Sequence, residues 1–269
     1  MDFDTQATSY NERVGFPDEA IDPIVMAICK MIPEAGEAVL LELGAGTGTL
    51  GIALAKQLGS YIGMDQSSAM LNQATSSGRF PPGVNMLVAD ASKPWPIESD
   101  LVQCFFTSRA LHLFDLDNVC SELQRTADPV GAIFLVGRVE RDRDSLHSVL
   151  RREMRRYLRE AGYIARDGFR AWEQLATVLS EWNGKMLAPR TVASWQRSRS
   201  PAQMLSAWEN KPGLGGLSIP DEEKTAILSR LRVWAEENWY NDFDKLCEIN
   251  ESYVLRGISF QTSSHNKYK

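Results

Sequence analysis

The stretch "LLELGAGTGTLGIAL" (residues 40–54) places four glycines within eight positions, directly after an apolar run. An apolar strand followed by a glycine-rich loop and a helix is typical of the first unit of a nucleotide-binding α/β sheet. Read from Gly46 to Gly51, the glycines form G-x-G-x-x-G, and Asp65 follows at the distance expected of a dinucleotide site. Read from Glu42, they form E-x-G-x-G-x-G, which indicates a different cofactor.

The end of the preceding strand distinguishes these two frames. We expect a buried strand at 39–43, so the first glycine of the turn is Gly44. A dinucleotide fingerprint that starts at Gly44 has Thr49 in place of its third glycine, and one that starts at Gly46 begins two residues beyond the strand. Only the E-x-G-x-G-x-G frame fits without adjustment. Gly51 then becomes a helix residue that we expect to allow close packing against the sheet.

Composition and charge indicate a globular protein with a small-molecule partner. The chain has 269 residues, of which 43% are apolar and 24% are charged, as in ordinary globular domains. Its formal net charge of -6 argues against binding to nucleic acid, because such proteins need basic surface for electrostatic affinity. We therefore expect a small-molecule partner and no nucleic acid.

Neither a metal site, a disulfide framework nor a membrane segment is expected. The cysteines are scattered, with no C-x-x-C pair. The N-terminal residues 1–10 are acidic where a signal peptide would be basic and then apolar, and no run reaches the roughly 20 apolar residues that a membrane helix needs. We therefore expect a cytoplasmic protein without a metal and without membrane association. The four cysteines are Cys29, Cys104, Cys120 and Cys247.

Short apolar runs alternate with amphipathic stretches as far as residue 138, which is the signature of βαβ units around a parallel sheet. The helix after the glycine loop is expected to continue to Leu58, because Gly59 ends it. Ser67 is placed to cap the next helix. The predicted strands lie at 39–43, 61–65, 84–90, 100–108 and 131–137.

Beyond residue 138 the apolar periodicity becomes helical. No Ser/Gly linker separates the two halves, so we predict a single domain over residues 1–269. The predicted helices lie at 146–161, 169–182, 201–210 and 220–240. The predicted parts of the domain are an N-terminal cap segment (1–35), a cofactor-binding core (36–140), a helical lid or substrate region (141–247) with one strand near 191–197, and a closing strand (248–260).

Five motifs in order carry a family resemblance: VLLELGAGTGTL, YIGMDQSSAMLNQA, VNMLVADASKPWP, DLVQCFFTSRALHLFD and GAIFLVG. The sequence resembles the class I S-adenosylmethionine-dependent methyltransferases, specifically the type 11 group that includes ubiquinone and menaquinone biosynthesis enzymes. The resemblance implies a Rossmann-like α/β fold, with a seven-stranded mostly parallel sheet, helices on both faces and a helical cap inserted after the fifth strand. It also implies S-adenosyl-L-methionine as the cofactor.

The resemblance assigns the glycine loop to the methionine end of the cofactor. The backbone of Gly44, Gly46 and Gly48 has no Cβ atoms, so a ligand can lie against it. Glu42 is implied to organise the site near the ligand's ammonium group. The resemblance implies Ala45, Gln66 and Thr107 as further cofactor-binding residues.

Two aspartates at predicted strand ends are implied to bind the nucleoside. Asp65 would accept hydrogen bonds from both ribose hydroxyls, and an anionic acceptor makes such bonds stronger. Asp90 would bind the exocyclic amine of the adenine, and Ala91 would offer its backbone amide to the ring. Alternatively, both aspartates only cap the turns that follow them. Met70 and Leu111 are implied as apolar walls for the adenine.

The N-terminal segment resembles a family segment that folds over the cofactor. Tyr10 and Arg13 match the positions that contact it there, and Arg13 is implied to pair with the cofactor carboxylate. A surface role for Arg13 is the alternative.

His112 is the candidate catalytic base. It follows the predicted strand 100–108, where related enzymes place residues that face the reacting methyl group. A hydroxyl or carbon acid needs such a base, whereas an amine needs only to be neutral. Alternatively, His112 only shapes the pocket.

Two features of the second half have competing interpretations. The arginine-rich run 151–159 indicates either an anionic substrate or, more simply, the solvated face of a helix. Trp172, Trp195 and Trp208 are candidate walls of an acceptor pocket, or else part of an apolar core.

We therefore predict a methyltransferase that acts on O, N or C of a small-molecule acceptor, as a monomer or homodimer. An NAD(P)-dependent reductase is the second hypothesis, although no Tyr-x-x-x-Lys pair supports it. The third is a non-catalytic subunit that binds S-adenosylmethionine and contacts a partner protein.

Overall fold

The computed structural model describes residues 15–76, 78, 80–81, 84–239 and 241–262. The helices are α2 (Asp18–Met31), α3 (Gly51–Ala55), α4 (Ser68–Ser76), the short 3-10 helix η2 (Leu111–Leu113), α5 (Leu116–Thr126), α6 (Leu146–Glu160), α7 (Gly168–Glu181), α8 (Pro201–Glu209) and α9 (Asp221–Asn238). The strands are β1 (Val39–Leu43), β2 (Ser60–Asp65), β3 (Asn85–Val88), β4 (Cys104–Ser108), β5 (Ala132–Arg141), β6 (Lys185–Arg199) and β7 (Cys247–Phe260).

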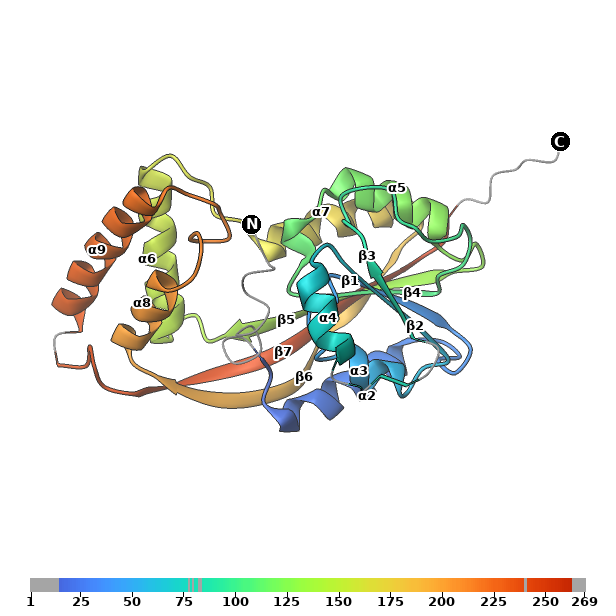
Figure 1. Cartoon of the computed structure of the whole chain (residues 1–269), viewed down its shortest axis with the longest axis horizontal. Coiled ribbons are helices and arrows are strands. Elements are labelled where there is room, and N and C mark those ends of the chain that lie inside the picture. The colour runs from blue at the N-terminus through green and yellow to red at the C-terminus, as the bar shows by residue number, and fades with distance from the viewer. Residues whose placement is uncertain (1–14, 77, 79, 82–83, 240, 263–269) are drawn as a thin grey trace. The chain divides into compact units, whose positions relative to one another are not determined.

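The strands form one seven-stranded sheet in the order β3-β2-β1-β4-β5-β7-β6. The first five strands pair in parallel. Helices α2 and α3 lie on one side of this part of the sheet, and α5 and α7 lie on the other (Figure 1). The predicted Rossmann-like fold with a mostly parallel sheet is therefore confirmed.

The last two strands in this order run antiparallel to their neighbours. A Cβ built on Gly131, just before β5, lies near Phe260 at the end of β7, whereas one built on Gly137 lies near Tyr253. Residue numbers therefore rise along β5 while those of the neighbouring β7 residues fall, as in an antiparallel pair. Side-chain hydrogen bonds show the same reversal between β6 and β7. These bonds join Ser194 to Ser252 and Gln196 to Asn250.

The described part of the chain divides into two compact units, which we call the core unit (15–138, 168–193 and 253–262) and the helical unit (139–167 and 194–252). Each has its own apolar cluster. The helical unit packs α6, α8 and α9 around side chains such as Leu158 and Leu231. Strands β5, β6 and β7 each run from one unit into the other.

Helix α7 belongs to the core unit, although its segment was predicted to be part of the lid. Trp172 and Leu175 are buried in the apolar cluster that also contains Phe105 and Phe134 of the sheet. The helical period of a sequence shows which face of a helix is apolar, but it does not show which part of the protein that face packs against. The packing of α7 against the sheet could therefore not be predicted from its sequence.

Glycine allows a close approach of α3 to the sheet. A Cβ on Gly51 would lie 2.2 Å from the Tyr61 hydroxyl oxygen, so the predicted role of Gly51 in tight helix packing is confirmed. The prediction that this helix continues to Leu58 is wrong, because α3 ends at Ala55.

Candidate active site

The strand order reverses between β1 and β4, because the chain moves outward from β1 to β3 and then returns to the other side of β1. Ligands of open α/β sheets bind beyond the carboxyl ends of the strands at such a switch point. The buried hydroxyl of Thr107 donates to the carbonyl of Leu43 at 2.9 Å, which ties the ends of β4 and β1 together. The loops that leave these two ends form the candidate site.

The loop after β1 is built from three glycines in the left-handed region. Gly44, Gly46 and Gly48 have φ values of +74°, +56° and +70°. A Cβ on Gly44 would lie 2.7 Å from the Cβ of Ala110, so the loops after β1 and β4 approach closely there. A Cβ on Gly46 would meet no atom of the described residues within 4 Å. The loop backbone is therefore open at Gly46, where a ligand can lie against it.

Asp65 fastens this loop to the end of β2. One carboxylate oxygen accepts the N–H of Gly46 at 2.9 Å, and the other accepts the N–H of Ser67 at 2.9 Å. Asp65 thus caps the turn that follows it. These two bonds do not exhaust the carboxylate, because each of its oxygens can accept more than one hydrogen bond. Ser67 in turn accepts the N–H of Met70 and caps α4, as predicted.

Glu42 is a buried carboxyl group beneath the glycine loop. It accepts a 2.5 Å hydrogen bond from the hydroxyl of Tyr61. Burial raises the pKa of Glu42 to about 8; the bond from Tyr61 and the charge of Arg109 lower it, and the charge of Asp65 raises it. The carboxyl therefore holds a proton over much of the neutral range, and a cation bound beside it would favour ionisation.

Asp90 and Ala91 begin the loop that follows β3. The N–H of Ala89 donates to the carbonyl of Asp65, so this loop starts beside the end of β2. Asp90 accepts the N–H of Ser92 at 2.9 Å and so caps the turn that follows it. The carbonyl of Ala91 accepts the indole N–H of Trp95 at 3.1 Å.

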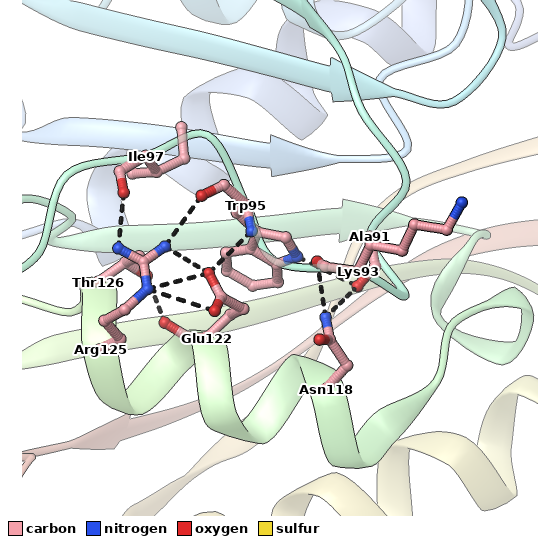
Figure 2. A network of polar contacts seen from close by, with 8 residues as sticks. All are labelled: Ala91, Lys93, Trp95, Ile97, Asn118, Glu122, Arg125 and Thr126. Carbon is pink, nitrogen blue, oxygen red and sulfur yellow. Dashed lines mark hydrogen bonds and ion pairs between the residues drawn. The ribbon is translucent and has the colours of Figure 1, made fainter.

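A polar network holds this loop against α5, as Figure 2 shows. Glu122 accepts the backbone N–H of Trp95 at 2.9 Å and pairs with Arg125. Arg125 also donates to the carbonyls of Trp95 at 3.0 Å and Ile97 at 2.7 Å. Burial raises the pKa of Glu122, but the bonds from Arg125 and from the Trp95 N–H outweigh it, so the pKa is lowered overall. Sequence reasoning missed this network.

Asn118 anchors the first half of the same loop (Figure 2). Its amide group donates to the carbonyls of Ala91 at 3.0 Å and Lys93 at 2.8 Å. The segment that contains the predicted adenine-binding residues is therefore fixed from α5 at both ends.

Arg109 is a second feature that sequence reasoning missed. It follows β4 directly and has a φ of +61°, which is unusual for a residue with a side chain. Its N–H donates to the carbonyl of Gly137 at 3.0 Å, and its guanidinium lies 4.4 Å from the centre of the Phe16 ring. The positive charge of Arg109 lowers the pKa of Glu42, so its guanidinium lies near enough to that carboxyl group to favour ionisation.

Tyr253 joins the closing strand to the same end of the sheet. Its hydroxyl lies 2.8 Å from that of Ser108, and its ring meets the Phe16 ring edge-on at 5.2 Å. Gly137 makes room for it, because a Cβ there would lie 1.8 Å from the Tyr253 hydroxyl. Burial raises the pKa of Tyr253 well above its ordinary value, so the hydroxyl remains protonated.

His112 lies in η2, between the loop after β4 and the start of α7. Its Nδ1 would be 3.5 Å from a Cβ on Gly168, the first residue of α7. Leu111 of η2 and Met70 of α4 are both buried, as walls of a pocket would be, whereas Gln66 is exposed. The predicted contacts of Tyr10 and Arg13 lie outside the described residues.

Two of the three candidate pocket tryptophans lie in or against an apolar cluster. Trp172 is buried in the cluster of the core unit. Trp208 packs against the cluster of the helical unit, and Trp195 is buried in that unit and donates its indole N–H to Glu251. The core interpretation is therefore confirmed for Trp172.

The arginine-rich run on α6 is largely an ion-paired surface. Arg155 pairs with Asp167, and Arg156 pairs with Glu153 and Glu160. Arg151 and Arg159 are exposed, as the interpretation of a solvated helix face predicts, whereas Arg155 is half-buried.

Among the residues that the structure describes, no group of three or more His, Cys, Asp or Glu side chains is arranged to hold a metal ion. Within the same residues, no helix is both long and apolar enough to cross a membrane.

Comparison with known proteins agrees with this geometry. Residues 40–131, which include β1 to β4 and the loops of the candidate site, match the family model of a methyltransferase domain. No curated protein matches the chain.

Three solved structures share the fold. Phosphoethanolamine N-methyltransferase 2 of Haemonchus contortus, in complex with phosphomonomethylethanolamine and S-adenosylhomocysteine, is 16% identical with a TM-score of 0.51; the alignment covers 97% of this chain and 58% of that one. The YcgJ protein of Bacillus subtilis is 17% identical with a TM-score of 0.55, with coverage of 89% and 98%. The [4+2]-cyclase SpnF is 16% identical with a TM-score of 0.58, with coverage of 97% and 94%.

The chain thus spans little more than half the length of the Haemonchus contortus protein. One structure of this fold is named for a cyclisation, so the fold alone does not determine the reaction of this chain.

Proposed function

We propose that this chain, of which residues 40–131 match the family model of a methyltransferase domain, uses S-adenosylmethionine to methylate a small molecule at O, N or C. The open, left-handed backbone at Gly46, fastened to Asp65 at the switch point of the sheet, is the observation that carries this proposal. A ligand that lies against this glycine loop is surrounded by the buried carboxyl group of Glu42, the carboxylate of Asp65 and the loop after β3, which α5 holds in place.

The ammonium group, the ribose and the adenine of the cofactor each have a partner in the chain. Its ammonium group lies near Glu42, whose ionised form it favours. Its ribose hydroxyls donate to Asp65, which keeps acceptor capacity beside its two backbone bonds. Its adenine lies beside Asp90 and Ala91, in the loop held by α5.

The bound cofactor supplies a methyl group on a positively charged sulfur, which is already activated for in-line displacement. The contribution of the chain is then mainly to orient donor and acceptor and to exclude water. His112 accepts the proton when the acceptor is a hydroxyl or a carbon acid. Haemonchus contortus phosphoethanolamine N-methyltransferase 2 provides a precedent for a small acceptor on this fold.

The test is calorimetric titration with S-adenosylmethionine and with NADH, followed by an acceptor screen that detects S-adenosylhomocysteine. We expect binding of S-adenosylmethionine and turnover of at least one acceptor, with mass spectrometry locating the added methyl group. Binding of NADH with no binding of S-adenosylmethionine would overturn the proposal. Binding without turnover across the screen, together with co-purification of a second chain, would favour the non-catalytic subunit.

A further inference from the structure

The part of the sheet that lies in the helical unit carries several arginines on one face. Along β6, Trp195 is buried and Arg197 and Arg199 are half-buried, whereas the residues between them are exposed. Alternate residues of a strand point to opposite faces, so these three side chains share the inner face. Arg141 of β5 and Glu251 of β7 meet them there.

Glu251 is the carboxylate around which this face is organised. It is 5% exposed and accepts the Nε–H of Arg141 at 2.6 Å and the indole N–H of Trp195 at 2.7 Å. It also forms an ion pair with Arg197, whose Nε lies 2.9 Å from a carboxylate oxygen. By strand alternation, Glu248 of the same strand lies on the opposite, exposed face. Among the described residues, Arg141, Arg197 and Arg199 of β5 and β6 therefore share the inner face with Glu251.

Further cations come to the same place from outside the sheet. Burial lowers the pKa of His147, in the first turn of α6, to about 3, and the positive charges of Arg141, Arg151, Arg199 and Lys211 lower it further. The ring of His147 lies 6.2 Å from that of Trp208, centre to centre. His147 is therefore neutral, and the charges of these four basic side chains create a positive potential around it, which attracts anions.

We propose that the basic cluster Arg141, Arg151, Arg197, Arg199 and Lys211 binds a multiply charged oxyanion, the phosphate or carboxylate groups of a small molecule. Guanidinium groups match the planar or tetrahedral oxygens of both anions with paired hydrogen bonds, which makes arginine the preferred residue for such sites. Glu251 holds two of the arginines in position, and the rings of Trp195 and Trp208 supply apolar surface. The inference concerns the helical unit alone and does not depend on methyl transfer.

The probes are inorganic pyrophosphate and succinate, titrated calorimetrically into the full-length protein. Ionic strength is kept constant with sodium chloride, so that general screening does not contribute to the signal. The test variant is Arg199→Gln, and Lys211→Gln provides a second if the first does not fold. The matched control is Arg190→Gln, which removes one positive charge from an exposed position of the same strand.

We expect saturable binding of at least one probe, weakened by about tenfold or more in Arg199→Gln or Lys211→Gln and unchanged in Arg190→Gln. Binding of pyrophosphate alone identifies a phosphate site, and binding of succinate alone identifies a carboxylate site. A proton NMR titration gives a second readout, because a bound anion should raise the pKa of His147. No binding of either probe, or equal weakening in Arg190→Gln, would overturn the proposal.

Discussion

Replacing Gly46 with alanine separates the cost of a strained backbone from the loss of a ligand surface. The φ of Gly46 is +56°, and in the part of the chain that the structure describes a Cβ there meets nothing within 4 Å. In the unbound protein the substitution should therefore lower the free energy of unfolding only by the strain of an alanine in the left-handed region, which is about 1 to 2 kcal/mol. For a chain of this size that corresponds to a fall in Tm of roughly 2 to 8 °C.

Gly162 provides the matched control for this strain. It follows α6, has a φ of +85°, and a Cβ there also meets nothing within 4 Å. Gly162→Ala should therefore lose about as much stability as Gly46→Ala, within about 1 kcal/mol. Gly36→Ala has open space and no positive φ, so it should be neutral or slightly stabilising.

The two strained variants should differ when S-adenosylmethionine is added. If the cofactor lies against Gly46, the new methyl group forces it away from the loop, and we expect affinity to fall by about tenfold or more, a loss of at least about 1.4 kcal/mol. Gly162→Ala should bind like the unaltered protein. Thermal unfolding and calorimetric titration measure the two effects separately. If Gly46→Ala binds the cofactor within about twofold of the unaltered protein, the reasoning that places the ligand there is refuted.

Three further predictions concern stability, catalysis and the loop after β3. Because the pKa of Glu42 is about 8 when folded and 4.5 in its reference state, the contribution of this group to the free energy of unfolding is fully present below pH 4.5 and is lost as the pH rises through 8. Measured against Glu42→Gln by urea unfolding, the decline should reach up to about 1.4 kcal/mol per pH unit, and a rise over this range would contradict it. His112→Ala should lower kcat by about 10²-fold or more for a hydroxyl or carbon acceptor, with cofactor affinity unchanged, and full turnover would remove it as the base. Asn118→Ala and Asn210→Ala each delete an amide with two hydrogen bonds and should each cost about 1 to 2 kcal/mol in urea unfolding. Only Asn118→Ala should weaken cofactor binding, because it loosens Ala91, and equal affinities in the two variants would argue against that role.

Much of the sheet was predictable because its inner strands are continuous apolar runs. The bounds of β1, β2 and β7 lie within one residue of those predicted. Strand β6 is longer than the predicted 191–197, since it spans Lys185–Arg199 at the edge of the sheet. Most of its side chains are exposed and it contains Pro189, so neither an apolar run nor clean alternation marks its first half.

The part of the candidate site that depends on local backbone geometry was predictable from the sequence. The frame that begins at Glu42 predicts the special roles of Gly44, Gly46 and Gly48, and all three have a positive φ. The roles of Arg109 and Glu122 depend on residues far away in the chain. No spacing in the sequence relates such partners, so only the folded chain brings them together.

The helical unit is assembled from two separate segments of the chain, and the core unit resumes between them and after them. During synthesis, neither unit can be completed before the other has begun. The helical unit cannot be completed before residues 194–252 have been synthesised, and the core sheet cannot be completed before the second half of β7 has followed them. Nascent chains of this protein should therefore expose the edge of β5 that later pairs with β7 while residues 142–252 are added, and chaperones are expected to bind such an edge.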